Sequence, residues 1–132
     1  MRTGGAPGFA RVALAMIRIA NGSTALVAPT VLTRNLGVER ADNQAIQYVF
    51  RMFGVRTVLI GLELLLPDGE VRAAAVRVAP VIHASDTAAA ALAGLTRQIP
   101  ARSAVIATSI SALNTALALT ALAGQREARA AA

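Results

Sequence analysis

A histidine and an acidic side chain lie three residues apart in an otherwise apolar segment of this 132-residue chain. On a helix His83 and Asp86 are neighbours, and a carboxylate beside an imidazole can fix its tautomer and raise its basicity. Pro80, one turn earlier, is predicted to kink the helix and to free a carbonyl oxygen near them. With Glu63, these residues are candidates for a proton-coupled carrier or a membrane-embedded enzyme. Because the spacing also arises by chance, we predict no catalytic residue, metal site or cofactor.

Other polar residues recur at seven-residue spacing in apolar segments. Arg11 and Arg18 share one helix face, and Arg56 and Glu63 share another. A charge that faces lipid is costly, so these stripes are expected to turn inward. The two arginines and two acids of this interior balance, which is consistent with two ion pairs between helices. The predicted polar interior consists of Arg18, Asn21, Arg56, Glu63, His83, Asp86 and Asn114.

This interior has a functional and a structural interpretation. The functional one is a polar pocket near the middle of the membrane, which binds a lipid headgroup or small ligand or handles a proton. The structural one is that charges between helices fix their register, and we favour it for Arg56 and Glu63. Gly54 and Gly61 form a second stripe, roughly opposite that pair, where small residues would let another helix approach closely.

The composition indicates a membrane protein. Hydrophobic residues make up 55% of the chain and charged residues 15%, whereas soluble domains average about 25% charged residues. The segment 103–125 carries no charge and would span about 34 Å as a helix, enough for a hydrocarbon core of about 30 Å. It is the one segment predicted to span the membrane unaided, because the other helices contain arginines or acids that neighbours must shield.

The charge and residue types also limit the partners. The formal net charge is +6, but all basic residues are single arginines scattered among apolar residues, and only four aromatic residues are present. We therefore predict no nucleic-acid partner and expect membrane lipids as partners, with a protein partner or homo-oligomer left open. Because the chain has no cysteine, disulfides and thiolate chemistry are excluded.

Proline and glycine signals divide the chain into helices. Pro29 is predicted to end or kink the first helix, Asp42 to cap the second, and Pro100 to begin the fourth. The predicted fold is all-α, a four-helix transmembrane bundle with up-down topology. Its parts are a flexible leader at 1–8, helices at about 9–28, 42–66, 70–94 and 101–123, and a solvated tail at 124–132.

Three stretches resemble the DUF4267 family of small membrane proteins. They are the segment from Gly22 to Gly37, the sequence from Phe50 to Gly61, which begins Phe-Arg-Met-Phe-Gly-Val-Arg, and the helix that contains Asp86. The resemblance implies a four-helix integral membrane protein and no established activity. The family-like positions that it carries over are Gly54, Arg56, Gly61 and Asp86.

Together these features predict a small integral membrane protein that acts as a binding or accessory subunit with a polar intramembrane pocket. Its location is expected to be a bacterial cytoplasmic membrane, with both termini on the cytoplasmic side. The first alternative is the enzyme or proton-coupled carrier that uses His83, Asp86 and Glu63. The second is a soluble, alanine-rich helical bundle, which requires a polar face on every helix.

Overall fold

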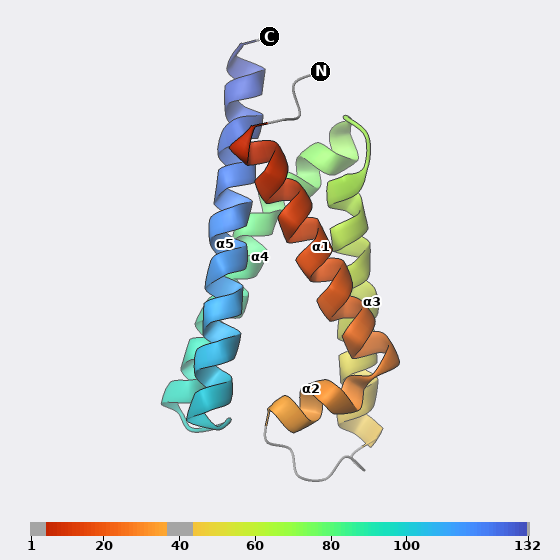
Figure 1. Cartoon of the computed structure of the whole chain (residues 1–132), viewed down its shortest axis with the longest axis vertical. Coiled ribbons are helices and arrows are strands. Elements are labelled where there is room, and N and C mark those ends of the chain that lie inside the picture. Colours follow the sequence, from red (N-terminus) through yellow and green to blue (C-terminus); the bar gives the residue numbers. More distant parts are fainter. Residues whose placement is uncertain (1–4, 37–43, 132) are drawn as a thin grey trace.

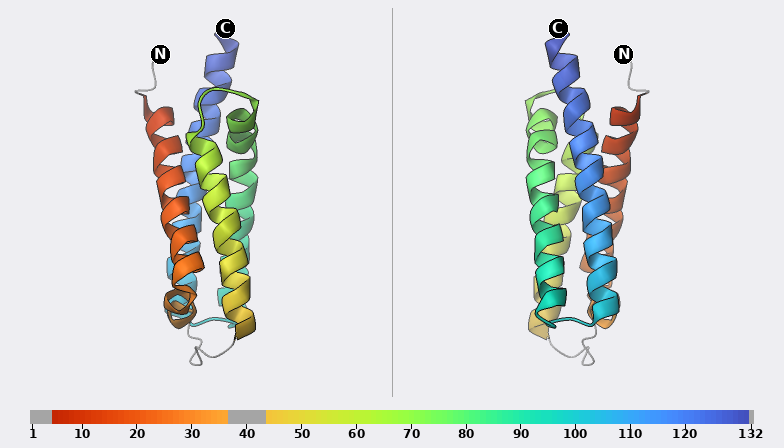
Figure 2. Two further views of the ribbon diagram at one scale, coloured as in Figure 1. Left: turned by 90° about the vertical axis from the view of Figure 1, so that its right-hand side faces the viewer. Right: turned by 90° about the vertical axis from the view of Figure 1, so that its left-hand side faces the viewer.

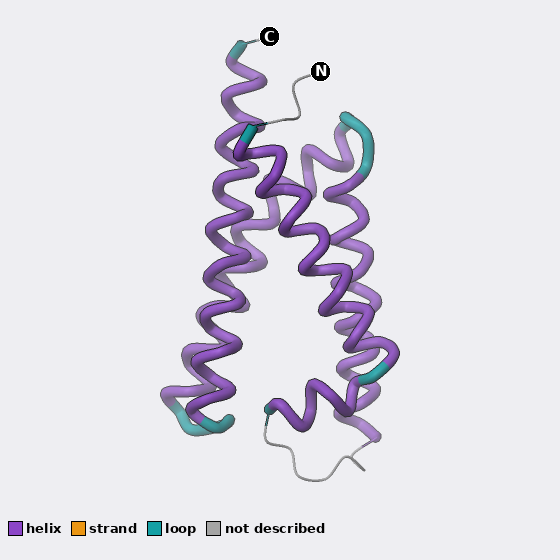
Figure 3. The backbone as a smooth tube through the Cα atoms, viewed as in Figure 1, coloured by secondary structure: helices purple, strands orange, loops and turns teal. Residues whose placement is uncertain are grey.

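Every regular element in the described part of the chain is a helix. The computed structural model describes residues 5–36 and 44–131, and within them it contains no strand. The all-α prediction is therefore confirmed. The described residues form four long helices and one short one (Figures 1 and 3): α1 (Ala6–Val27), α2 (Pro29–Asn35), α3 (Gln44–Leu65), α4 (Glu70–Leu95) and α5 (Ala101–Ala130).

The long helices form two antiparallel pairs. The most extensive contacts join α1 to α3 and α4 to α5; α1 also packs on α5, whereas α3 and α4 touch little. The start of α1 and the end of α5 lie at the same end of the molecule, and α2 lies at the opposite end (Figures 1 and 2). The two pairs diverge toward the α2 end in Figure 1.

Small side chains make up most of the interior. Leu14 and Leu64 are fully buried, but most of the other apolar residues in the core are alanines. Helices whose facing side chains are this small can lie close together, which is the packing found between helices in membranes. The central cluster contains Leu14, Ala15, Leu64, Ala75, Val76, Ala79, Ala118 and Ala121.

Glycines bring the backbones of α1 and α3 into contact. A Cβ atom at Gly54 would lie 2.6 Å from the Gly22 carbonyl oxygen, and one at Gly22 would lie 2.8 Å from the Gly54 carbonyl oxygen. At Gly61 it would lie 2.8 Å from Cγ1 of Ile19. The glycine stripe predicted on the second long helix therefore lies against α1.

Several helix boundaries differ from those predicted. The first helix ends at Val27, just before Pro29 as predicted, but Pro29 also begins a helix that was not predicted, α2, and α1 and α2 are bent by 102°. Ala6 begins α1, within the predicted leader, and Pro7 suits its first turn because a helix needs no N–H donor there. The last helix runs to Ala130, beyond the predicted end near residue 123. The predicted cap, Asp42, lies outside the described residues.

Two described helices are long and apolar enough to cross a membrane, α4 and α5, and a third span results if α1 and α2 count as one bent span. The prediction that only the last helix would qualify unaided is wrong. Within α4, residues 78–95 carry a single charged side chain, Asp86, because Arg72 and Arg77 lie near its start. This stretch is therefore apolar enough to cross a membrane, although it contains His83 and Asp86.

Candidate functional site

Each long helix contributes one buried polar side chain. Arg18 of α1 is 5% exposed, Thr57 of α3 is 4%, His83 of α4 is 2% and Asn114 of α5 is 7%. All four line one cavity, and each lies near the middle of its helix. We call these four residues the polar layer.

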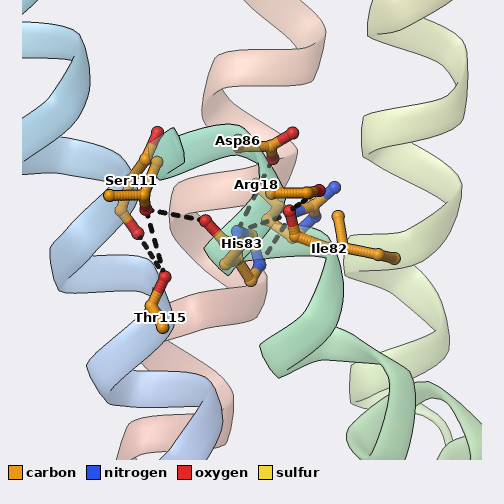
Figure 4. Close-up of polar contacts among 8 residues, drawn as sticks. Arg18, Ile82, His83, Asp86, Ser111 and Thr115 are labelled. Carbon is orange, nitrogen blue, oxygen red and sulfur yellow. Dashed lines mark hydrogen bonds and ion pairs between the residues drawn. The ribbon is translucent and has the colours of Figure 1, made fainter. Parts of the chain in front are cut away.

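Arg18 and His83 form the central contact of the polar layer. The Arg18 Nη1 atom lies 2.7 Å from Nε2 and 3.1 Å from Nδ1 of His83 (Figure 4). A guanidinium can only donate hydrogen bonds, so the ring nitrogen that it contacts must offer a lone pair. His83 is therefore neutral in this arrangement, and the shorter distance favours Nε2 as the acceptor.

Asp86 approaches the Nδ1 atom of the imidazole. Its Oδ2 atom is 3.9 Å from the His83 Nδ1 atom (Figure 4), which is too long for a direct hydrogen bond. If Nε2 accepts from Arg18, the Nδ1 atom carries the proton and points its donor toward this carboxylate. Neither ring nitrogen then has a free lone pair, which disfavours His83 as a general base.

The cavity beside the polar layer has a volume of about 710 Å³. Its polar end is formed by the polar layer with Asp86, and its middle by apolar side chains that include Phe50, Phe53, Ile106 and Ile110. Residues of α2 and of the start of α5 complete it, and Ser103 Oγ donates a hydrogen bond to the Asn35 carbonyl oxygen between these two elements. The cavity therefore lies at the end of the molecule where the helix pairs diverge.

Three polar atoms of the polar layer have no partner. They are Nε of Arg18, Oγ1 of Thr57 and Oδ1 of Asn114. A buried polar group without a hydrogen bond costs about 1–3 kcal/mol, and more when it is charged. Water or a bound molecule that reached these three atoms would satisfy their hydrogen bonds.

The predicted interior is only partly assembled at this cavity. Arg18, His83, Asp86 and Asn114 line it, and so does Asn21, although its side chain is largely exposed. Arg56 and Glu63 do not line it.

The inward placement of Arg56 is wrong, since this residue is exposed. The buried face of α3 consists of Gly54, Thr57, Gly61 and Leu64 and packs on α1. At 100° per residue, Arg56 lies more than a quarter-turn from that face. Glu63 is half-buried but lies on the same side of the helix as Arg56.

The two predicted interhelical ion pairs are absent from the part of the chain that the structure describes. The two acid–base contacts found there join Arg72 to Asp68, in the turn before α4, and His83 to Asp86 within α4. Asp86 still lies within electrostatic range of the Arg18 and Arg56 guanidiniums. No group of three histidine or acidic residues in the described ranges could hold a metal ion.

Pro80 and the two helical glycines occupy buried positions. The α4 helix is continuous through Pro80, one turn before His83, and the proline ring is buried. Its missing N–H leaves the Val76 carbonyl without its usual helical donor. Gly54 and Gly61 lie at the α1–α3 contact described above.

Thr57 is the member of the polar layer that sequence reasoning missed. A single threonine in a helix attracts no attention, because its hydroxyl usually bonds a carbonyl of its own helix. The available signal was its spacing of three and four residues from Gly54 and Gly61. This spacing places it on the face that packs against another helix.

No family model, curated protein or solved structure matches this chain. The resemblance to the DUF4267 family stays a prediction.

Proposed function

We propose that this chain is an integral membrane four-helix bundle that binds a small ligand in a polar intramembrane cavity. The observation that carries the proposal is the polar layer. Four buried polar side chains, one from each long helix, meet at a cavity inside a molecule whose outer surface is largely apolar.

The distribution of side-chain size supports a membrane location. The interior consists mainly of alanine and glycine, whereas large aliphatic and aromatic side chains lie outside; Val81 and Val105, for example, are 70% and 65% exposed. In water so much exposed apolar surface would drive aggregation or association. In a bilayer it is solvated by lipid chains, and small residues are left for helix contacts.

The last helix argues against the soluble alternative. A soluble bundle needs a polar face along each helix. The exposed side chains of α5 that do not line the cavity instead include three large aliphatic residues: Val105, Leu113 and Leu119.

The charges in the weaker spanning helices are compatible with a bilayer. In α1 the mid-helix Arg18 is buried against α4, so its charge does not face lipid. In α3 the long side chain of Arg56 can extend along the apolar surface toward a polar region. We infer from these placements that α1 and α3 span as part of the assembled bundle.

The cavity has the size and chemistry of a ligand site. Its volume of about 710 Å³ falls within the range of about 300–1,000 Å³ typical of small-molecule pockets. Such pockets combine apolar walls with a few polar groups that orient the ligand.

Four spans would place both ends of the bundle on one side of the membrane, in an up-down topology that agrees with the shared location of the start of α1 and the end of α5. A bacterial cytoplasmic membrane, cytoplasmic termini and membership of the DUF4267 family remain parts of the proposal.

Extraction of membranes tests the membrane location. Membranes that contain the full chain are washed with alkaline carbonate and then with a mild detergent. We expect the chain to stay in the carbonate pellet and to be released by detergent, in parallel with a known multi-pass protein. Release into the carbonate supernatant would refute the membrane bundle.

A further inference from the structure

We infer that the cavity binds an apolar molecule through a single carboxylate group, which is held by the free edge of the Arg18 guanidinium. This inference rests on the proposed function and names the class of ligand that the cavity takes.

The free edge of Arg18 has the geometry of a carboxylate receptor. Both contacts of the side chain with His83 use Nη1, while Nε is buried and has no partner. The Nε and Nη2 atoms form one side of the planar guanidinium and present two parallel N–H donors. Two such donors match the two oxygens of a carboxylate.

No acidic side chain in the described ranges forms a direct ion pair with Arg18. Its side chain is 5% exposed, and its hydrogen-bond partner, His83, is neutral in this arrangement. Asp86 forms its one close contact with His83, at 3.9 Å. A buried cation without a direct counter-ion is costly, and a bound anion at the free edge would remove that cost.

The other charged residues of the cavity also favour an anion. Arg34 of α2 and Arg102 of α5 line its opposite end, and among the described residues that line the cavity Asp86 is the one acidic residue. Clefts lined by charges of one sign raise the local concentration of ligands of the opposite sign. The two arginines would therefore attract an anionic molecule at the end of the bundle where the cavity lies.

The walls between the two polar ends fit an apolar body. Phe50, Phe53, Ile106 and Ile110 line this part. The cavity follows α5 from Arg102 to Asn114, which is about 18 Å along the helix at 1.5 Å per residue. A ligand with a medium-length alkyl chain or an aromatic body fits this length.

A carboxylate fits the polar end better than a phosphate does. A phosphate monoester carries nearly two charges and three strong acceptor oxygens. One guanidinium edge and the Thr57 hydroxyl, whose oxygen has no partner, supply three donors. They match a carboxylate, which accepts two hydrogen bonds from the guanidinium and a third from the hydroxyl.

Competition between ligands with the same alkyl chain tests the inference. The full chain is placed in lipid nanodiscs, and bound radiolabelled decanoate is displaced by decanoate, decanol, decylammonium or decyl phosphate. We expect decanoate to compete at least 10-fold better than each of the other three, because a hydrogen-bonded charge contributes about that factor or more. Competition by decanol within threefold of decanoate, or stronger competition by decyl phosphate, would overturn the carboxylate assignment.

Variants of the two arginines on one face of α1 locate the site. Arg18→Gln and Arg18→Lys should each lower decanoate affinity about 10- to 100-fold, the second because an ammonium lacks the two-donor edge. Arg11→Gln is the matched control, since Arg11 does not line the cavity, and its affinity should stay within threefold of the parent. An unchanged preference for decanoate in Arg18→Lys would overturn the role of Arg18.

The ligand series separates the two levels of the proposal without any variant. If decanol and decanoate bind equally well, the cavity is a binding site and only the carboxylate inference fails. If no compound of the series binds, the binding function itself fails along with it.

Discussion

Replacing Gly54 with alanine should force α1 and α3 apart. The added Cβ would lie 2.6 Å from the Gly22 carbonyl oxygen and 2.8 Å from the Leu26 backbone nitrogen. Ordinary contact begins at 3.4 Å, so the first distance is too short by about 0.8 Å. Because both obstructing atoms belong to the backbone, no side-chain rotation can relieve the overlap, and the helices must separate.

The size of the effect follows from two opposing contributions. Overpacking a tight contact costs about 1–3 kcal/mol, whereas alanine is favoured over glycine inside a helix by about 1 kcal/mol. The difference is about 0–2 kcal/mol. Because every atom that obstructs the Cβ at Gly54 belongs to the backbone, we expect Gly54→Ala to lower the free energy of unfolding by the upper part of that range, about 1–2 kcal/mol. The double variant Gly22→Ala/Gly54→Ala should cost less than the sum of the two single variants, since helices already moved apart accommodate the second methyl group.

Equilibrium unfolding in mixed micelles provides the measurement. Helix content is followed by circular dichroism as the denaturing detergent is increased, for the parent and each variant. Ser109→Ala is the control, because Ser109 lies on the exposed surface of α5, and its stability should match the parent within about 0.5 kcal/mol. A Gly54→Ala variant as stable as the parent would refute the backbone contact between α1 and α3.

Two further substitutions test the polar contacts by the same unfolding assay. His83→Leu removes the hydrogen-bond partner of Arg18 and should lower the free energy of unfolding by about 2 kcal/mol. Its control, Ser85→Ala at an exposed site, should change the free energy of unfolding by less than about 0.5 kcal/mol. Equal stabilities for the two variants would refute the Arg18–His83 contact. Thr87→Val should also cost less than about 0.5 kcal/mol, because Thr87 and Thr115 each direct their single hydroxyl proton to a carbonyl of their own helix and have none left for each other at 3.3 Å. A loss above 1.5 kcal/mol in Thr87→Val would show that the two hydroxyls do bond across α4 and α5.

Hydrophobic composition and helix-breaking residues were sufficient to predict an all-helical chain. Prolines and glycines also located the turn before α4 and the start of α5 near their observed positions. The short helix α2 was missed, because proline at the first position of a helix and proline that ends a helix look alike in a sequence. The extension of α5 to Ala130 involves a long-range contact, a hydrogen bond from Gln125 Nε2 to the Ala73 carbonyl, which no local pattern reveals.

The candidate site shows where helical spacing stops being informative. Seven-residue spacing correctly grouped Arg56 with Glu63, but it could not say which way their shared face would turn. That choice was made by Gly54 and Gly61, whose face is required for contact with α1. The contact of Arg18 with His83 could not be predicted either. The two residues are 65 positions apart in the sequence, and which helices pair depends on the whole bundle.

A pair of cysteine variants tests the central claim, a polar cavity inside a membrane-embedded bundle. The chain has no cysteine of its own, so Ser109→Cys and Ser111→Cys each introduce one thiol, about 3 Å apart along α5. Ser111 is half-buried and lines the cavity, whereas Ser109 lies on the exposed surface.

The measurement is the rate of modification by a charged methanethiosulfonate in intact membranes, with denatured samples as the reference. The reagent attacks the thiolate, which forms only where water reaches the sulfur. We predict that Ser111→Cys is modified and that Ser109→Cys, in contact with lipid, is not. Faster modification of Ser109→Cys than of Ser111→Cys, as expected for a bundle surrounded by water, would contradict the account.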